Sequence, residues 1–114
     1  MSVVFDPTSH LLGEMVRVTA QRHRVLAANL ANVETPDYRA QEASFAVALD
    51  EARGGARVEL SVGPDADAVP RRDGNSVDLD RQMVKLAQNT GWHLGVLQIL
   101  ANRLGLMRTV ITSR

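Results

Sequence analysis

Two histidines are the side chains in this sequence best suited to binding a metal ion or transferring a proton. His23 and His93 fall on the apolar faces of two segments that have helical spacing. A metal site would need a third ligand, and no cysteine or carboxylate lies one helical turn away on the same face. We therefore interpret both residues as hydrogen-bonded structural histidines, and we predict no metal site and no cofactor.

The other candidate groups match no recognised chemistry either. Arg17, Arg22 and Arg24 spread around their helix, and the formal net charge of the 114 residues is zero, which is typical of a solvated surface rather than a nucleic-acid interface. The Gly54–Gly55 pair matches no phosphate-binding spacing. No serine or aspartate is paired with a histidine in a catalytic motif. The sequence predicts no enzyme, no small-molecule substrate and no nucleic-acid partner.

A long first helix is the first element that the pattern predicts. Asp6 is a good N-cap and Pro7 is tolerated at the first helical position, so the helix is expected to begin there and to run to about Val33. Pro36 then disfavours helical geometry at Thr35. The apolar face of this helix comprises Leu12, Met15, Val16, Thr19, Leu26, Leu30 and Val33.

A second, longer helix is predicted to begin near Asn75 or Ser76, either of which could cap it. Apolar residues recur in it at alternating four- and three-residue steps, which is typical of a coiled coil. This predicted seam comprises Leu79, Met83, Leu86, Thr90, His93, Leu97, Leu100, Leu104, Met107 and Ile111. Together with the apolar face of the first helix, it predicts an antiparallel coiled-coil hairpin.

The C-terminal half of the second helix carries a further apolar stripe. It comprises Trp92, Val96, Ile99, Leu106 and Val110. One partner helix can cover only one seam, and an exposed stripe of this size favours association, so we expect it to contact other copies of the chain. We find no stretch approaching transmembrane length and no secretory signal, so we expect no membrane insertion, and composition alone favours a soluble cytosolic protein.

The middle of the chain is predicted to be small and irregular. Ser44 is expected to cap a short helix through Phe45, Leu49 and Ala52, ended by Gly54–Gly55. Residues 57–62 alternate polar and apolar, which predicts a strand that packs on a helix, on another short segment or on a neighbouring molecule. The expected fold is mainly α, with a coiled coil from residues 1–34 and 75–114, a small extended segment at 35–74, and one structural unit overall.

Two motifs resemble those of the flagellar axial proteins. The first is a helix end of the form A-N-[LI]-A-N followed by T-P-G-Y, matched by Asn29, Leu30, Ala31, Asn32, Thr35, Pro36 and Tyr38. Asp37 stands where that family usually has glycine, and because aspartate tolerates a left-handed or turn conformation we expect the same turn, with some strain or a shifted type. The second motif, residues 73–80, is similar to the D-G-N-x-V-D-L-D run that opens the C-terminal helix of the proximal rod member. The absence of a large insertion favours that member.

The resemblance implies a structural subunit of the bacterial flagellar basal-body rod, which transmits torque and forms the export-channel wall through its terminal helices. It implies as partners other copies of the chain, other rod proteins, and export-gate or adaptor proteins at the rod base. It also implies a periplasmic location reached by flagellar type III export without a cleaved signal peptide. The alternative is a soluble cytosolic dimeric coiled-coil adaptor or regulator, which would need one seam and a polar exterior.

Overall fold

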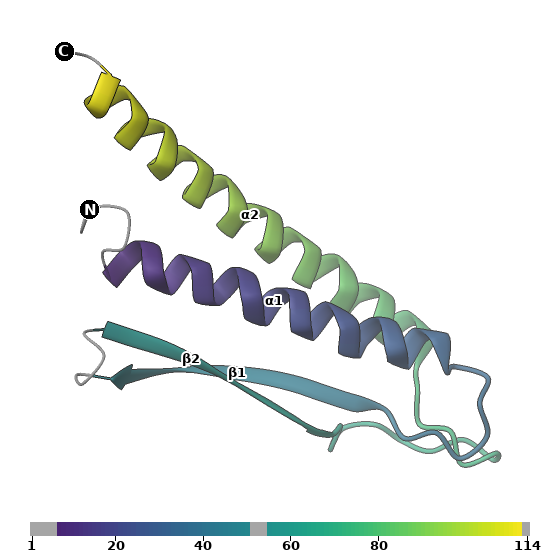
Figure 1. Cartoon of the computed structure of the whole chain (residues 1–114). Helices are drawn as coiled ribbons and strands as arrows, with labels where there is room; N and C mark the ends of the chain where they lie inside the picture. Colours follow the sequence, from purple (N-terminus) through teal and green to yellow (C-terminus); the bar gives the residue numbers. More distant parts are fainter. Residues whose placement is uncertain (1–6, 51–54, 113–114) are drawn as a thin grey trace.

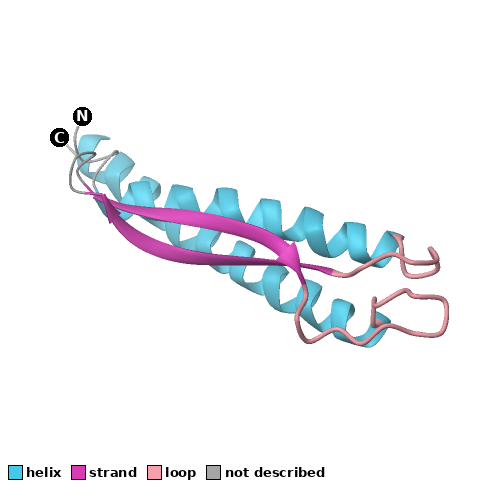
Figure 2. Ribbon diagram, turned by 90° about the horizontal axis from the view of Figure 1, so that it is seen from below, coloured by secondary structure: helices cyan, strands magenta, loops and turns pink. Residues whose placement is uncertain are grey.

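The computed structural model of the chain describes residues 7–50 and 55–112. Four elements follow in order: α1 (Pro7–Ala31), β1 (Gln41–Asp50), β2 (Gly55–Pro64) and α2 (Leu79–Thr112). The two helices run antiparallel, and the β-hairpin folds back along them to give an elongated, two-layered molecule of 67 × 30 × 16 Å (Figures 1 and 2). The predicted mainly α fold with a helical hairpin is confirmed. The expected cap Asp6 and the expected stop at Gly54 lie outside the described residues.

The residue that caps the start of α2 is not one of the two that were predicted. Asp78 caps the helix, because its Oδ1 accepts a hydrogen bond of 3.2 Å from the backbone N–H of Arg81. The two predicted caps serve elsewhere: Asn75 Oδ1 accepts from the N–H of Val77, and Ser76 Oγ accepts from the N–H of Ala40. All of these residues have the side chains of good caps, and their long-range partners decide which one serves.

The predicted short helix after Ser44 is wrong, because this stretch is strand β1. Its ten residues pair with β2 in an antiparallel register that runs from Gln41–Pro64 to Asp50–Gly55. This pairing satisfies backbone groups that a short helix would leave open at its ends. The strand predicted at residues 57–62 is confirmed, and its partner is within the molecule.

One face of the hairpin is apolar and packs toward the helices. The cross-strand pairs Ala43–Val62, Phe45–Leu60 and Val47–Val58 share this face. Ala43 and Val58 are buried, whereas their partners Val62 and Val47 are exposed, as expected for a twisted ribbon that meets the helices along a diagonal. Midway, the ring of Phe45 makes an edge-on contact with that of Trp92 on α2, with 6.0 Å between centroids.

The residues of α2 that face α1 follow a heptad spacing, but this row is rotated around the helix relative to the predicted seam. Apart from Arg81 and Lys85, the residues of α2 that are buried or half-buried are Gln82, Leu86, Asn89, His93, Val96, Leu100, Arg103 and Met107. Met83, Leu97, Leu104 and Ile111 are 38–63% exposed, so their predicted place in the intramolecular seam is wrong. Polar side chains at 82, 89 and 103 hide the true heptad from a hydrophobicity pattern.

Candidate assembly surface and the junction that orients it

The two sequence motifs meet in one hydrogen-bonded junction at the end of α1. Asn75 is fully buried, and its amide donates to the carbonyls of Asn32 and Thr35 at 2.8 and 2.7 Å. Arg71 reaches across from the same loop and donates to the carbonyl of Val33. These carbonyls lie where α1 has ended, so they lack helical partners. Side chains of the second motif and of Arg71 therefore supply further donors to the backbone acceptors that follow the end of α1.

Backbone contacts close the same junction. The N–H of Asp37 donates to the carbonyl of Asp73 at 2.9 Å, and the N–H of Ser76 donates to the carbonyl of Tyr38 at 3.0 Å. The two loops thus run side by side between α1 and the start of α2. This pairing holds the point at which the chain leaves the helical hairpin and enters β1.

The turn inside the first motif has the conformation that was expected. Residues Thr35–Tyr38 form a turn in which the N–H of Tyr38 donates to the carbonyl of Thr35 at 3.3 Å, and Asp37 has a φ of 62°. Proline at the second position and a positive φ at the third identify a type II turn, which usually has glycine at that third position. Asp37 therefore adopts the left-handed geometry that glycine would take there.

We predict that Gly74→Ala destabilises the fold by about 1–3 kcal/mol, because the residue has a positive φ and its surroundings are closed. Gly74 has a φ of 82°, and an added Cβ would lie 2.2 Å from Oδ1 of Asp37. Urea unfolding followed by circular dichroism measures the loss. In the Asp37→Gly background the same substitution should cost less, since the carboxylate is gone. An equal cost in both backgrounds would show that this contact does not matter.

Asn29 connects three elements instead of closing α1. It lies inside the helix, fully buried, and its amide donates to the carbonyl of Gln41 at 2.8 Å and to Oε1 of Gln82 at 3.1 Å. Its Oδ1 accepts from the N–H of Gln41 at 3.0 Å and from the hydroxyl of Tyr38 at 3.4 Å. Asn29 thus lies in the last turn of α1, as the motif predicted, but its side chain is used for contacts with other elements. It attaches the start of β1 and the first turn of α2 to α1.

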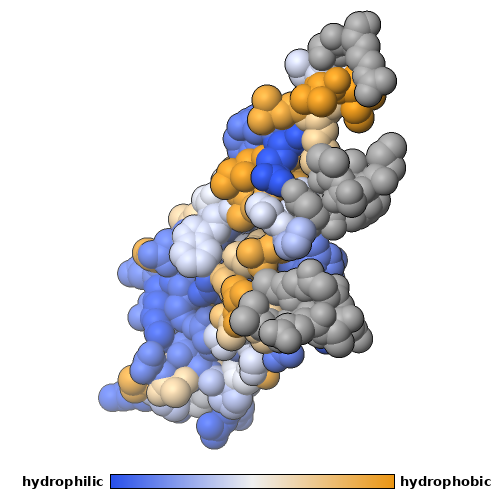
Figure 3. Space-filling model, turned by 90° about the vertical axis from the view of Figure 1, so that its left-hand side faces the viewer, coloured by the Kyte–Doolittle hydropathy of each residue, from blue (hydrophilic) through white to orange (hydrophobic). Residues whose placement is uncertain are grey.

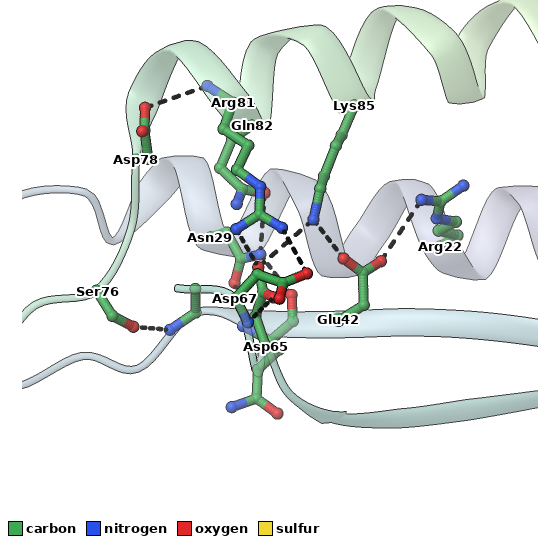
Figure 4. A network of polar contacts seen from close by, with 12 residues as sticks. Arg22, Asn29, Glu42, Asp65, Asp67, Ser76, Asp78, Arg81, Gln82 and Lys85 are labelled. Carbon is green, nitrogen blue, oxygen red and sulfur yellow. Dashed lines mark hydrogen bonds and ion pairs between the residues drawn. The ribbon is translucent and has the colours of Figure 1, made fainter. Parts of the chain in front are cut away.

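An ion-pair cluster, shown in Figure 4, fastens the hairpin to both helices. The carboxylate of Asp65 is 3% exposed and lies 3.0 Å from the guanidinium of Arg81 and 3.4 Å from the ammonium of Lys85. Lys85 also pairs with Glu42 on β1, which in turn lies 3.5 Å from Arg22 on α1. A buried carboxylate is tolerated only when its charge is compensated. The cluster thus makes the position of the hairpin depend on both helices.

A second link joins the hairpin to α1 nearer its start. Arg17 donates to the carbonyl of Val58 on β2 at 3.1 Å and pairs with Glu14 one turn earlier. The hydrogen bond and the charge of Arg17 lower the pKa of Glu14 below its ordinary value.

Polar contacts also join the two helices along their length, and we call them the polar rungs. Arg103 Nε donates to Ser9 Oγ at 3.3 Å, and Asn89 Nδ2 donates to the carbonyl of Thr19 at 2.8 Å. His93 Nδ1 lies 2.7 Å from Thr19 Oγ1, and the Asn29–Gln82 bond completes the set. Residues near the start of α1 contact residues near the end of α2, and the reverse, as expected for antiparallel helices. None of these pairs was predicted as a pair, because polar residues at heptad spacing are a weak signal without the partner helix.

The two histidines line one shallow pocket between the helices. Thr19 Oγ1 lies 2.7 Å from Nδ1 of His93 and 2.7 Å from the carbonyl of Met15, so a hydrogen bond joins His93 to α1. His93 is thus a hydrogen-bonded structural histidine, as interpreted from the sequence. His23 is exposed. Among the described residues, no group of three His, Cys, Asp or Glu side chains could hold a metal ion.

The outer surface of α2 is apolar on both sides of the α1-facing heptad. Trp92, Ile99, Leu106 and Val110 lie on one flank, whereas Met83, Leu94, Leu97 and Leu104 lie on the other, and all eight are exposed. Val96, predicted in the stripe, is half-buried in the heptad toward α1. Figure 3 shows hydrophobic surface gathered over the C-terminal part of α2. We call these two sets the Trp92 flank and the Leu97 flank.

By length and composition alone, α2 would pass as a membrane-spanning helix. It contains an 18-residue window of mean hydropathy 1.3, and none of that window is buried within the chain. This finding corrects the expectation that no stretch approaches transmembrane length. A single such helix is weak support for a membrane span, because helices buried in soluble proteins meet the same criterion.

The flagellar basal body rod protein FlgB of Salmonella typhimurium is 31% identical to this chain, over 86% of the chain and 88% of that protein. The chain belongs to the FlgB family. FlgB of Escherichia coli is also 31% identical, over 88% of the chain and 89% of its own length, and FlgB of Bacillus subtilis is 27% identical over 80% and 82%. No family model matches the sequence.

Membership in the FlgB family confirms the resemblance seen in the two motifs. The family consists of structural proteins of the flagellar basal-body rod, which fits the prediction that the chain is not an enzyme. Several residues that build the junction and the cluster were missed from the sequence, namely Asp65, Arg71, Arg81, Gln82 and Lys85. Asn75 and Ser76 were predicted as alternative caps and as part of the second motif, and the motif was the signal for their contacts at the junction.

Proposed function

We propose that this chain is a proximal-rod subunit that assembles through α1 and α2 with copies of itself and with other rod proteins. In this proposal the helices form the wall of the export channel, and the assembled rod transmits torque. The chain would also contact export-gate or adaptor proteins at the rod base. It would act in the periplasmic space after type III export without a cleaved signal peptide. FlgB membership supports the rod assignment.

The observation that carries the proposal is the pair of exposed flanks on α2. Their eight large apolar side chains lie on both sides of a helix that α1 already occupies. Monomeric soluble proteins rarely leave so much contiguous apolar surface uncovered. Because the Trp92 flank and the Leu97 flank lie on opposite sides of the heptad, two different neighbours can cover them. A tubular assembly requires each subunit to contact neighbours on at least two sides, whereas a closed dimer requires only one contact surface.

The junction has a geometric role in this proposal. It holds residues 35–40 and 71–76 together and turns the chain so that β1 runs back along α1 (Figure 1). The small extended segment predicted at 35–74 lies along the helices in the single chain (Figure 1). We propose that the polar outer face of the hairpin, which includes Ser44, Ser61 and Glu59, points away from the tube axis.

The competing function is a soluble dimeric adaptor, and sedimentation of the purified chain separates the two. A rod subunit without its neighbours should be monomeric or heterogeneous, and its terminal helix turns should fray, because most helix stability comes from packing. The C-terminal turns of α2 are exposed on nearly all sides, which makes them the first candidates. A concentration-independent dimer with fully formed helices would contradict the rod proposal and support the adaptor.

A further inference from the structure

The contact between α1 and α2 uses the more polar surface that α2 has available. Gln82, Asn89 and Arg103 occupy one row of the α1-facing heptad, and among the buried or half-buried residues of that row Val96 alone is apolar. Next to this row, Met83, Leu97 and Leu104 are exposed. Burial of apolar surface contributes about 25 cal/mol per Å², so hydrophobic contact alone would favour the neighbouring row.

The alternative packing needs only a small rotation of α2. Successive residues on a helix are 100° apart, and a turn of about 50° would bring the Leu97 flank against α1. Leu86, His93, Leu100 and Met107 belong to both the predicted and the observed heptads, so they would stay in the interface. The rotated helix pair would thus keep half of the present contact and exchange a largely polar row for an apolar one. It would also hide the Leu97 flank from any neighbouring subunit.

The polar rungs oppose this rotation at three points along α1. They lie near its start at Ser9, in its middle at Thr19 and near its end at Asn29. Rotation would break these bonds, each of which contributes about 0.5–1.5 kcal/mol to stability. Single buried polar residues set the register of coiled coils for the same reason.

We propose that the polar rungs select the rotation of α2 and thereby keep the Leu97 flank on the outside of the helix pair. Asn89 and Arg103 are positioning residues, since they act on the flank through the orientation of the helix. The inference rests on the proposed function only in naming subunits as what covers the flank. The orientation itself is a property of the isolated chain and can be tested without assembly or motility.

Thiol labelling tests the orientation, because the chain has no cysteine of its own. Single cysteines are placed at Thr90, beside the Leu97 flank, and at Gln88, on the opposite side of the helix; both positions are exposed. Each is introduced into the parent chain and into an Asn89→Ala/Arg103→Ala variant. Alanine removes the hydrogen bonds of Asn89 and Arg103. Because alanine is small, it adds little hydrophobic contact between α1 and the α2 row that now faces it. The labelling rate with a small maleimide is then measured on the purified, folded chain.

In the double variant we expect the cysteine at position 90 to react about fivefold more slowly, because rotation moves it toward α1, while position 88 keeps its rate. Unchanged rates at both positions would overturn the proposal. Faster labelling at both would also overturn it, since the rungs would then only hold the helices together. Should the double variant lose its helical circular dichroism, single Asn89→Ala should show the same pattern more weakly.

Two control variants test whether a change in labelling rate is specific to the polar rungs. Gln98→Ala/Asn102→Ala removes a bond of 3.1 Å between exposed side chains on the outer polar strip, so parent rates are expected. Arg103→Lys keeps a donor near Ser9 and should also retain the parent pattern. A slower cysteine at position 90 in the Gln98/Asn102 control would count against a specific role of the rungs.

Discussion

Replacing Ile99 with aspartate is expected to abolish swimming while leaving expression and export of the chain intact. Ile99 is 52% exposed on the Trp92 flank, so in the isolated chain the new carboxylate stays in water and costs little. In the assembled rod the same carboxylate would be buried against a neighbouring subunit, at several kcal/mol for each unpaired charge. Leu106→Asp, at a position 68% exposed on the same flank, should have the same effect.

Soft-agar motility and fractionation of the exported protein measure this outcome. The matched controls are Gln98→Asp and Asn102→Asp, because both residues lie on the exposed polar strip of the same helical region. These variants should swim like the parent. Normal swimming by both the Ile99 and the Leu106 variants would remove the case for subunit contacts on this flank.

Asn29→Ala is expected to reduce the free energy of unfolding by about 2–4 kcal/mol, because one buried side chain satisfies several partners at once. The substitution leaves both backbone groups of Gln41 and the amide of Gln82 without their bonds to α1. For a domain of this size such a loss is a large part of the total stability. Urea unfolding followed by helical circular dichroism gives the number.

Asn32→Ala is the matched control, since it removes the same residue type from the end of the same helix. Its amide makes an exposed bond to the carbonyl of Ala28, so the cost should stay below about 1 kcal/mol. Equal losses for the two variants would mean that Asn29 does not have a special role in joining β1 and α2 to α1.

The two long helices could be predicted because their signals are local. Pro7 marks the start of α1, the proline of the Thr35–Tyr38 turn excludes helix beyond it, and apolar residues recur at helical spacing in both segments. A turn at residues 35–38 could also be predicted, whereas the prediction left the conformation of Asp37 open between the same turn under strain and a shifted type, and the observed φ of 62° decides for the left-handed geometry. Features set by a few neighbouring residues were therefore predicted well.

Strand β1 could not be predicted, because its signal is weak without its partner. Its sequence, QEASFAVALD, includes three alanines, which favour helix, and its alternation is weakened because Ala46 and Ala48 occupy the face turned away from the helices. Pairing with β2 and contact of Phe45 with Trp92 decide the outcome, and both partners are distant in the sequence. Long-range pairing overrides a modest local preference here.

The rotation of α2 was missed for a related reason. Hydrophobic periodicity assumes that the most apolar row of a helix faces its partner, and in α2 that row remains exposed. The row that does face α1 contains Gln82, Asn89 and Arg103. These residues can be buried because they form hydrogen bonds with Asn29, Thr19 and Ser9 of α1, and those partners are distant in the sequence. In an assembling protein, the most apolar row of a helix can be reserved for another molecule.

The most direct test of the subunit-contact account is a density map of the intact basal body in which this chain is placed. We predict that α1 and α2 line the inner tube, with the side chains of the Trp92 flank and the Leu97 flank packed against different neighbouring subunits. A map in which either flank faces open solvent or lipid would contradict it.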